Sequence, residues 1–170
     1  MAAPQQNTAI IGGGVTGLGV AWQLSRHGHK VTVYEQNQFG QAASQAGAGM
    51  LAPQAEAKFE EENLMKLGQL SLSWYPEFLA QLRADLGQAP AFDQCGTLLV
   101  GVSRDDTAQL KRLFQFRESL NLNIEWLTGS EAREQVPALS PRVSSAMWLP
   151  HDAQIDNHQL LRDLVSVLEK

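Results

Sequence analysis

A glycine-rich turn near the N-terminus constrains the fold of this 170-residue chain more than any other feature. An apolar stretch, residues 8–11, precedes Gly12, Gly14 and Gly17 in the pattern G-x-G-x-x-G, and a helical stretch and a β-branched stretch, residues 30–34, follow. This order predicts a strand–helix–strand unit. The first glycine would permit a tight turn, the second would let a phosphate approach the backbone, and the third would let the helix pack closely on the strand. The free N–H groups and the positive end of the helix would then face the phosphate.

Glu35 directly follows the second stretch, 18 residues after Gly17. A carboxylate at the tip of this strand can accept hydrogen bonds from both hydroxyls of an adenosine ribose. No arginine follows it directly to bind a 2′-phosphate. The pattern therefore predicts a dinucleotide with an unmodified ribose, FAD or NAD. A strand–helix–strand unit with an ordinary tight turn is the alternative.

A second stretch, residues 36–52, consists largely of glycine and alanine and lacks charged side chains between residues 39 and 51. A solvent-exposed loop is normally richer in charged and turn-forming residues. So many small residues favour a backbone pressed against a large flat ligand. Ser44 is the hydroxyl placed to bond a phosphate oxygen, and Gly49 and Met50 could meet a ring system. A flexible Gly/Ala-rich linker is the alternative.

Residues 10–17, the pair Tyr34 and Glu35, and the run A-G-A-G-M-L-A-P-Q-A-E at residues 46–56 resemble the FAD-binding half of the D-amino-acid oxidase family. Within that family they resemble the glycine oxidases of thiamine biosynthesis. The resemblance implies an α/β fold, namely a Rossmann-like FAD-binding βαβ domain of the GR2 type with part of a second, mixed or antiparallel-sheet substrate domain. It also implies that FAD is the cofactor. The expected reaction is oxidative deamination of glycine or another small amino acid or amine, with oxygen as co-substrate and an imine, then a 2-oxo acid, and hydrogen peroxide as products.

The resemblance also assigns the site residues. The implied cofactor contacts are Gly12, Gly14, Val15, Thr16, Gly17, Glu35, Gln36, Ala43, Ser44, Ala48, Gly49 and Met50. Met50 would lie nearest the substrate. Relatives carry arginine or threonine where Ala42 and Ala43 stand, so backbone N–H groups are the expected phosphate donors. No catalytic residue is assigned, because the family's substrate-binding arginine and tyrosine are expected in a C-terminal half that this chain lacks, so that the fragment alone should be inactive.

The remaining elements are predicted from periodicity and capping patterns. The expected domains are an FAD-binding segment at 1–91, a partial substrate domain at 92–150 and a returning helix at 151–170. The patterns predict a helix over 56–87 with a kink or break before Pro76, and strands at 97–102, 124–127 and 144–149. Further helices are expected to begin after Ser103, after Thr128, and after Asp156 or Asn157. Cys95 is expected to be buried. Five arginines are expected to be solvated surface charges: Arg104, Arg112, Arg117, Arg133 and Arg142.

Composition narrows the class of protein. Hydrophobic residues make up 44% and charged residues 18%, which predicts a globular core, and the net charge of −5 without a basic cluster argues against nucleic-acid binding. A single cysteine excludes an internal disulfide, and no metal site is expected. The absence of a long apolar run or a signal-like N-terminus predicts a soluble, cytoplasmic protein without a membrane partner. Two competing interpretations are an NAD-dependent dehydrogenase fragment and a non-catalytic, truncated binding module that associates with another copy, as a homo-oligomer, or with its missing half.

Overall fold

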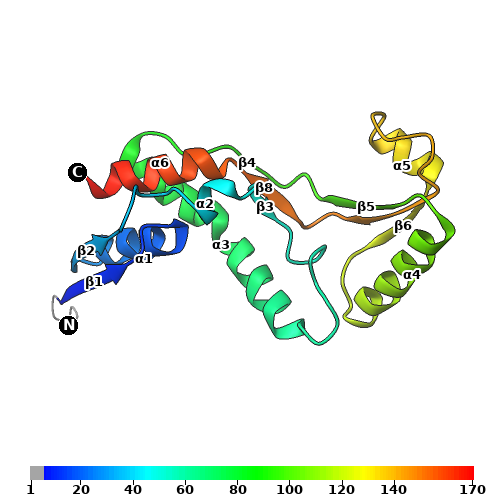
Figure 1. Cartoon of the computed structure of the whole chain (residues 1–170), viewed down its shortest axis with the longest axis horizontal. Coiled ribbons are helices and arrows are strands. Elements are labelled where there is room, and N and C mark those ends of the chain that lie inside the picture. The colour runs from blue at the N-terminus through cyan, green and yellow to red at the C-terminus, as the bar shows by residue number, and fades with distance from the viewer. Residues whose placement is uncertain (1–5) are drawn as a thin grey trace. The chain divides into compact units, whose positions relative to one another are not determined.

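The computed structural model describes residues 6–170, which form two compact units. Unit 1 comprises the residues up to Met50, Trp74–Phe92 and Ile155–Lys170, and unit 2 comprises Leu51–Ser73 and Asp93–Gln154. The elements follow one another as β1 (Asn7–Ile11), α1 (Val15–Arg26), β2 (Lys30–Tyr34), α2 (Ala43–Ala46), β3 (Met50–Leu51), α3 (Glu62–Leu86), β4 (Phe92–Asp93), β5 (Thr97–Gly101), α4 (Arg104–Ser119), β6 (Glu125–Thr128), α5 (Gly129–Gln135), β7 (Ser145–Leu149), β8 (Ala153–Ile155) and α6 (Asn157–Leu168) (Figure 1).

Unit 1 contains the strand–helix–strand unit that the glycine pattern predicts. β1 and β2 pair in parallel, with Asn7 opposite Lys30 and Ile11 opposite Tyr34. α1 connects the two strands, and Gly28 reverses the chain after it with a φ of +82°, a conformation that glycine adopts without strain. The predicted α/β beginning of the fold is confirmed.

The last helix, α6, packs against α1 within unit 1. The buried residues of α1 are Leu18, Ala21 and Trp22. Those of α6 are Leu160, Leu161 and Leu164 together with Asp163, whose Oδ1 accepts hydrogen bonds from the side chains of Gln88 and Gln159. The side chain of Asp156 accepts a hydrogen bond from the backbone N–H of Gln159 at 2.8 Å and so caps α6. Of the two candidate caps in the sequence, Asp156 is the one used, and Asn157 is the first residue of the helix.

The long helix α3 departs from its prediction at two places. It begins later than the expected residue 56, because Glu60 takes a φ of +68° that interrupts the helical backbone. It then continues through Pro76, so the helix does not break there, and the alternative expectation of a kink stays a prediction. Both corrections concern where the backbone can remain helical, which local sequence patterns indicate only roughly.

Aromatic packing surrounds Pro76 within unit 1. Tyr75 stacks on Phe92 with ring centroids 5.9 Å apart and an interplanar angle of 9°. Phe78 meets Trp22 edge to face at 5.0 Å and 88°. These contacts offset the hydrogen bond that proline cannot donate, so the helix persists.

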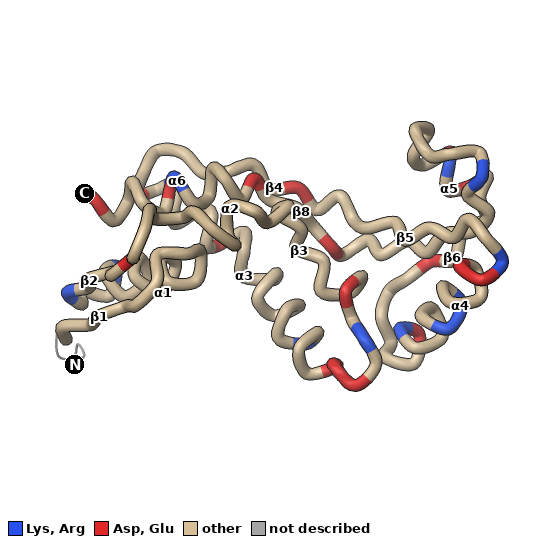
Figure 2. Tube along the Cα trace, viewed as in Figure 1, with Lys and Arg blue, Asp and Glu red and all other residues tan. Residues whose placement is uncertain are grey.

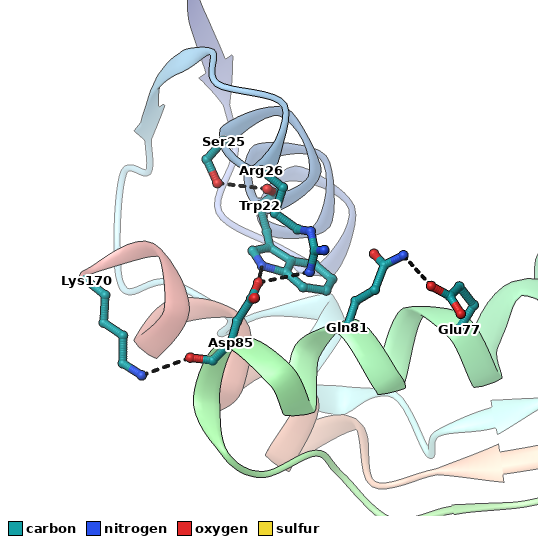
Figure 3. A network of polar contacts seen from close by, with 7 residues as sticks. All are labelled: Trp22, Ser25, Arg26, Glu77, Gln81, Asp85 and Lys170. Carbon is teal, nitrogen blue, oxygen red and sulfur yellow. Dashed lines mark hydrogen bonds and ion pairs between the residues drawn. The ribbon is translucent and has the colours of Figure 1, made fainter.

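Asp85, near the end of α3, joins this helix to α1 (Figure 3). Its Oδ2 accepts hydrogen bonds from the indole N–H of Trp22 and from Arg26, both at 3.0 Å. The Arg26 guanidinium also lies over the Trp22 ring, 5.3 Å from its centroid, while Lys170 donates to the Asp85 carbonyl oxygen at 3.2 Å. One carboxylate therefore satisfies a buried indole and an ion pair together.

Unit 2 is organised on an antiparallel sheet in the order β5, β7, β6. The central strand β7 is buried on both faces. On one face Met147 and Leu149 pack with Leu110 of α4, and on the other Ala146 packs with Leu127 and Ala132. This sheet confirms the antiparallel second layer that the sequence predicts.

Two capping boxes begin the helices of unit 2 where the sequence predicts them. The Ser103 hydroxyl accepts the Asp106 N–H at 3.1 Å, and the Asp106 carboxylate accepts the Ser103 N–H at 2.8 Å. Thr128 and Glu131 form the same reciprocal pair at α5. Basic and acidic residues are interspersed along α4 (Figure 2).

Short features of the chain escaped the sequence prediction. A third sheet has the order β3, β8, β4. Cys95 is exposed, so its predicted burial is wrong; it precedes Gly96, where a φ of +71° turns the chain. None of the helices in the described residues combines the length and apolar character that crossing a membrane requires.

Candidate functional site

The turn between β1 and α1 has the geometry that its glycines predict. Gly12 takes a φ of +103°, and its N–H donates to the carbonyl oxygen of Tyr34 at 2.8 Å. A Cβ at Gly17 would lie 2.0 Å from the Gly12 carbonyl oxygen, which no backbone could accommodate without moving. A Cβ at Gly12 would meet nothing within 4 Å, so the space in front of the turn is open. The chain therefore turns tightly and leaves room beside it.

Gly13, between the first two pattern glycines, is close to the Phe39 side chain, a contact that the sequence did not indicate. A Cβ there would lie 2.3 Å from the Phe39 ring. The Gly13 carbonyl oxygen accepts the N–H of Gly40 at 2.7 Å, which holds the residue that precedes the small-residue loop, residues 41–50, beside the turn. Phe39 and Gly40 are thus structural neighbours of the glycine turn.

The N-terminus of α1 is capped from a distant segment. Gly14, the N-cap residue, provides no side-chain cap. Instead the Ser44 hydroxyl oxygen accepts the N–H of Val15 at 3.0 Å, and a Cβ at Gly14 would lie 3.0 Å from the same oxygen. The Ser44 hydroxyl keeps its own proton for a further acceptor. A helix N-terminus with a bare N-cap and a hydroxyl donor beside it suits a phosphate group.

Glu35 lies at the end of β2 beside the turn. Its Oε2 accepts the Gly13 N–H at 2.8 Å and its Oε1 accepts the Asn37 N–H at 3.0 Å. These donors, Gly13 foremost, hold the pKa of Glu35 below its ordinary value. The ionised carboxylate keeps lone pairs on both oxygens, so it can also accept hydrogen bonds from ribose hydroxyls.

The small-residue loop, residues 41–50, contains the short helix α2 and has two residues with positive φ. Ala42 has a φ of +73°, which is strained for a residue with a Cβ, and Gly49 has a φ of +77°. The Gly49 carbonyl oxygen accepts the Ile155 N–H at 2.9 Å, and a Cβ at Gly49 would lie 2.0 Å from the Ile155 carbonyl oxygen. Gly49 is therefore required for the close approach of two backbones.

The structure brings some of the predicted site residues together and leaves others unconnected. Hydrogen bonds and close approaches join Gly12, Gly14, Val15, Gly17, Glu35 and Ser44 around the β1–α1 turn. Thr16 and Gln36 are exposed next to this group, and Ala43, Ala48 and Met50 are exposed on the loop. Met50 is 61% exposed at the first position of β3. The assignment of all these residues to a cofactor or substrate stays a prediction.

A buried charge cluster in unit 2 corrects the prediction for one arginine. Arg117 is 1% exposed and donates to the carbonyl oxygens of Gln54 at 2.7 Å, Ala55 at 2.5 Å and Ala57 at 3.2 Å. The expectation that Arg117 is a solvated charge is wrong. Residues 54–57 cover this part of α4, and their buried carbonyl groups need hydrogen-bond donors, which Arg117 provides. Burial lowers the pKa of Arg117, and the negative charge of Asp152 offsets part of that decrease.

Asp152 completes the cluster from the other side of the segment. It is 0% exposed, and its two oxygens accept the N–H groups of Gln54 at 3.1 Å and Ala55 at 3.0 Å. Burial raises the pKa of Asp152, and the two backbone donors and Arg117 counteract part of that rise. Within the described residues, no group of three His, Cys, Asp or Glu side chains could hold a metal ion.

Comparison with known proteins places this geometry in a family. Residues 7–170 match the family model described as FAD dependent oxidoreductase. The chain is 30% identical to the glycine oxidase of Geobacillus kaustophilus over 88% of its own length and 40% of that protein. It is 33% identical to the bifunctional protein ThiO/ThiG of Trichormus variabilis over 96% of its own length and 24% of that protein.

A solved structure agrees with the sequence relatives. The crystal structure of glycine oxidase from Geobacillus kaustophilus superposes with a TM-score of 0.89 at 28% identity, covering 98% of this chain and 45% of that chain. The chain thus spans less than half the length of each of these relatives. The match of the family model over nearly all of the sequence shows that the chain belongs to the FAD dependent oxidoreductases.

Proposed function

We propose that this chain binds the ADP part of FAD between the β1–α1 turn and residues 41–50, as the cofactor-binding portion of an oxidase that acts on glycine or another small amino acid or amine. The observation that carries the proposal is the α1 N-terminus, where the bare Gly14 and the Ser44 hydroxyl lie together. The family match supports FAD, and the similarity to a glycine oxidase supports a small amino-acid substrate.

The residues of this chain fit an FAD pyrophosphate and ribose. The phosphates would receive hydrogen bonds from the first-turn N–H groups of α1 and from Ser44, since Ala42 and Ala43 have no side-chain donor. Glu35 would accept hydrogen bonds from the ribose hydroxyls on the lone pairs that its backbone donors leave free. The glycines would let the backbone approach the ligand, and Gln36, Ala48 and Gly49 would line it.

The proposed reaction follows from the chemistry of the cofactor. Bound FAD would supply a two-electron acceptor, so that the amino group of an amino acid could be oxidised to an imine. Water would hydrolyse the imine to a 2-oxo acid and ammonia, and oxygen would take up the two electrons and two protons as hydrogen peroxide. The chain itself would orient the cofactor and contribute Met50 near the substrate. No residue of the chain is proposed as a general base.

Titration of the purified chain with FAD tests the proposal. We expect saturable quenching of flavin fluorescence, a flavin absorbance spectrum that remains after gel filtration, and no comparable binding of NAD. Preference for NAD over FAD would overturn the cofactor assignment. Glycine added without oxygen to the FAD-loaded chain tests the expectation that the chain alone is inactive. The visible flavin absorbance should persist, and its loss would show that these residues suffice to oxidise glycine.

A further inference from the structure

Ser44 is held by a residue far away in the sequence. Asn157, the first residue of α6, donates from its Nδ2 to the carbonyl oxygens of Ser44 at 2.9 Å and of Gly47 at 2.6 Å. The two acceptors account for both N–H groups of the side-chain amide, which fixes its orientation. Asn157 and Ser44 are 113 positions apart in the chain, and both belong to unit 1.

The helix that carries Asn157 is itself well anchored. α6 packs against α1 and α2, its inward face is buried, and Asp156 caps its N-terminus. The neighbouring Ile155 donates its N–H to the Gly49 carbonyl oxygen at 2.9 Å. Ile155 at the end of β8 and Asn157 at the start of α6 therefore hold three carbonyl oxygens of the small-residue loop. These are the carbonyl oxygens of Ser44, Gly47 and Gly49.

The contacts of Ser44 connect this anchor to the α1 N-terminus. Its carbonyl oxygen accepts from Asn157, and its hydroxyl oxygen accepts from the Val15 N–H at 3.0 Å. With one lone pair engaged by Val15, the hydroxyl proton remains to be donated away from α1. Holding the Ser44 backbone thus sets the place where that proton can be donated.

We propose that Asn157 is a positioning residue that fixes Ser44 and residues 43–47 in the geometry that receives the FAD pyrophosphate. The inference rests on the proposed function, because it names how that same site is held. Asn157 itself would not touch the cofactor. It would act through two carbonyl groups, and its loss would leave the loop free to move away from the α1 N-terminus.

Asn157→Asp separates positioning from helix stability. A carboxylate at the first turn of a helix favours the helix dipole, so α6 should keep its stability. The same carboxylate cannot donate and would face two carbonyl oxygens, so the loop contacts should be lost. We expect FAD affinity to fall about ten-fold or more, while the melting temperature of the FAD-free chain changes little. Asn123→Asp is the matched control. Asn123 is exposed in unit 2, and its side chain is hydrogen-bonded to the exposed ring of His151.

A double-mutant cycle tests whether Asn157 acts through Ser44. Ser44→Ala removes the hydroxyl donor and keeps the carbonyl that Asn157 holds. If positioning is the role of Asn157, the losses of FAD affinity in Asn157→Ala and Ser44→Ala should be strongly non-additive in the double variant. Additive losses, or an Asn157→Asp variant with the affinity of the unaltered chain, would overturn the inference.

Amide hydrogen exchange provides a readout that needs no cofactor. In the FAD-free chain, Asn157→Asp should accelerate exchange in residues 43–49 and leave α6 itself unchanged. Unchanged exchange in the loop would overturn the positioning role even if the chain binds FAD. Failure of the unaltered chain to bind FAD would instead overturn the proposed function and this inference with it.

Discussion

Two carboxylates, one in each unit, make the same kind of contact and respond to it in opposite ways. Glu35 in unit 1 and Asp152 in unit 2 each accept hydrogen bonds from two backbone N–H groups. The donors lower the pKa of the partly exposed Glu35, with Gly13 as the largest cause, whereas burial raises the pKa of Asp152 in spite of its donors. Desolvation therefore decides the direction when a charge is fully enclosed.

Two irregular segments, one in each unit, also differ in whether the side chains that hold them are neutral or charged. Residues 41–50 of unit 1 are held by the neutral side-chain amide of Asn157, and the lack of a side chain at Gly47 and Gly49 lets them pack closely against neighbouring atoms. Residues 54–57 of unit 2 are held by the buried charges of Arg117 and Asp152. Most residues of the loop in unit 1 are exposed, whereas Gln54 and Ala57 of the segment in unit 2 are buried. We therefore expect changes in unit 1 to act mainly on binding and changes in unit 2 to act mainly on folding.

The largest effect is expected when the charged anchor is broken. Arg117→Met removes the donors of three carbonyl oxygens and leaves the Asp152 carboxylate buried without its neighbouring cation. The free energy of unfolding should fall by about 3–5 kcal/mol, measured by urea denaturation. Arg112→Met, at an exposed position of the same helix, should stay within about 0.5 kcal/mol of the unaltered chain. Equal effects at both positions would show that the cluster around Arg117 contributes no more than a surface charge.

The next largest effect is expected on ligand binding in unit 1. In Gly14→Val the added carbons would displace the Ser44 hydroxyl and fill the space in front of the α1 N-terminus. FAD affinity should fall by at least about 100-fold, measured by fluorescence titration. Gly19→Ala is the matched control, because a Cβ there meets nothing within 4 Å and alanine favours the helix. Flavin binding retained in Gly14→Val would separate the glycine turn from the cofactor site.

Local signals in the sequence predicted the elements that depend on local chemistry. The glycine turn, the capping boxes at Ser103 and Thr128, and the apolar strand β7 lie where the patterns indicate. The continuous helix through Pro76 could not be predicted, because the packing of Tyr75 on Phe92 that supports it depends on tertiary structure. Short strands such as β4 and β8 carry too few residues for a periodic pattern.

The sequence predicts those residues of the candidate site whose type is set by a backbone conformation, a close backbone approach or a motif. Gly12, Gly17 and Glu35 are the respective examples. It was not predictable where a contact joins distant segments. Asn157 carries no pattern that connects it to Ser44, and Arg117 reads as an ordinary charged residue of an amphipathic helix until the segment at residues 54–57 covers it. Such contacts follow from the fold rather than from neighbouring residues.

A smaller effect, of opposite sign in the two units, should appear in the pH dependence of stability. Because the pKa of Asp152 is raised, the folded chain binds more protons than the unfolded chain above the ordinary value of 3.8, and the contribution of Asp152 falls as pH rises. The pKa of Glu35 is lowered, so its contribution is lost as pH falls below 4.5. Denaturation of Asp152→Asn and Glu35→Gln across this pH range should therefore give difference profiles of opposite slope. Parallel slopes would contradict the role assigned to burial.

The smallest effect concerns the strain in the neutral loop. Ala42 holds a φ of +73°, which glycine adopts without steric conflict, so Ala42→Gly should relieve the strain while adding backbone entropy to the unfolded chain. These terms nearly cancel, and the free energy of unfolding should rise by no more than about 1 kcal/mol. Ala46→Gly, within α2, lacks the relief and should lower stability by about 0.5–1 kcal/mol. If thermal denaturation shows equal losses for both variants, the backbone of Ala42 is not strained.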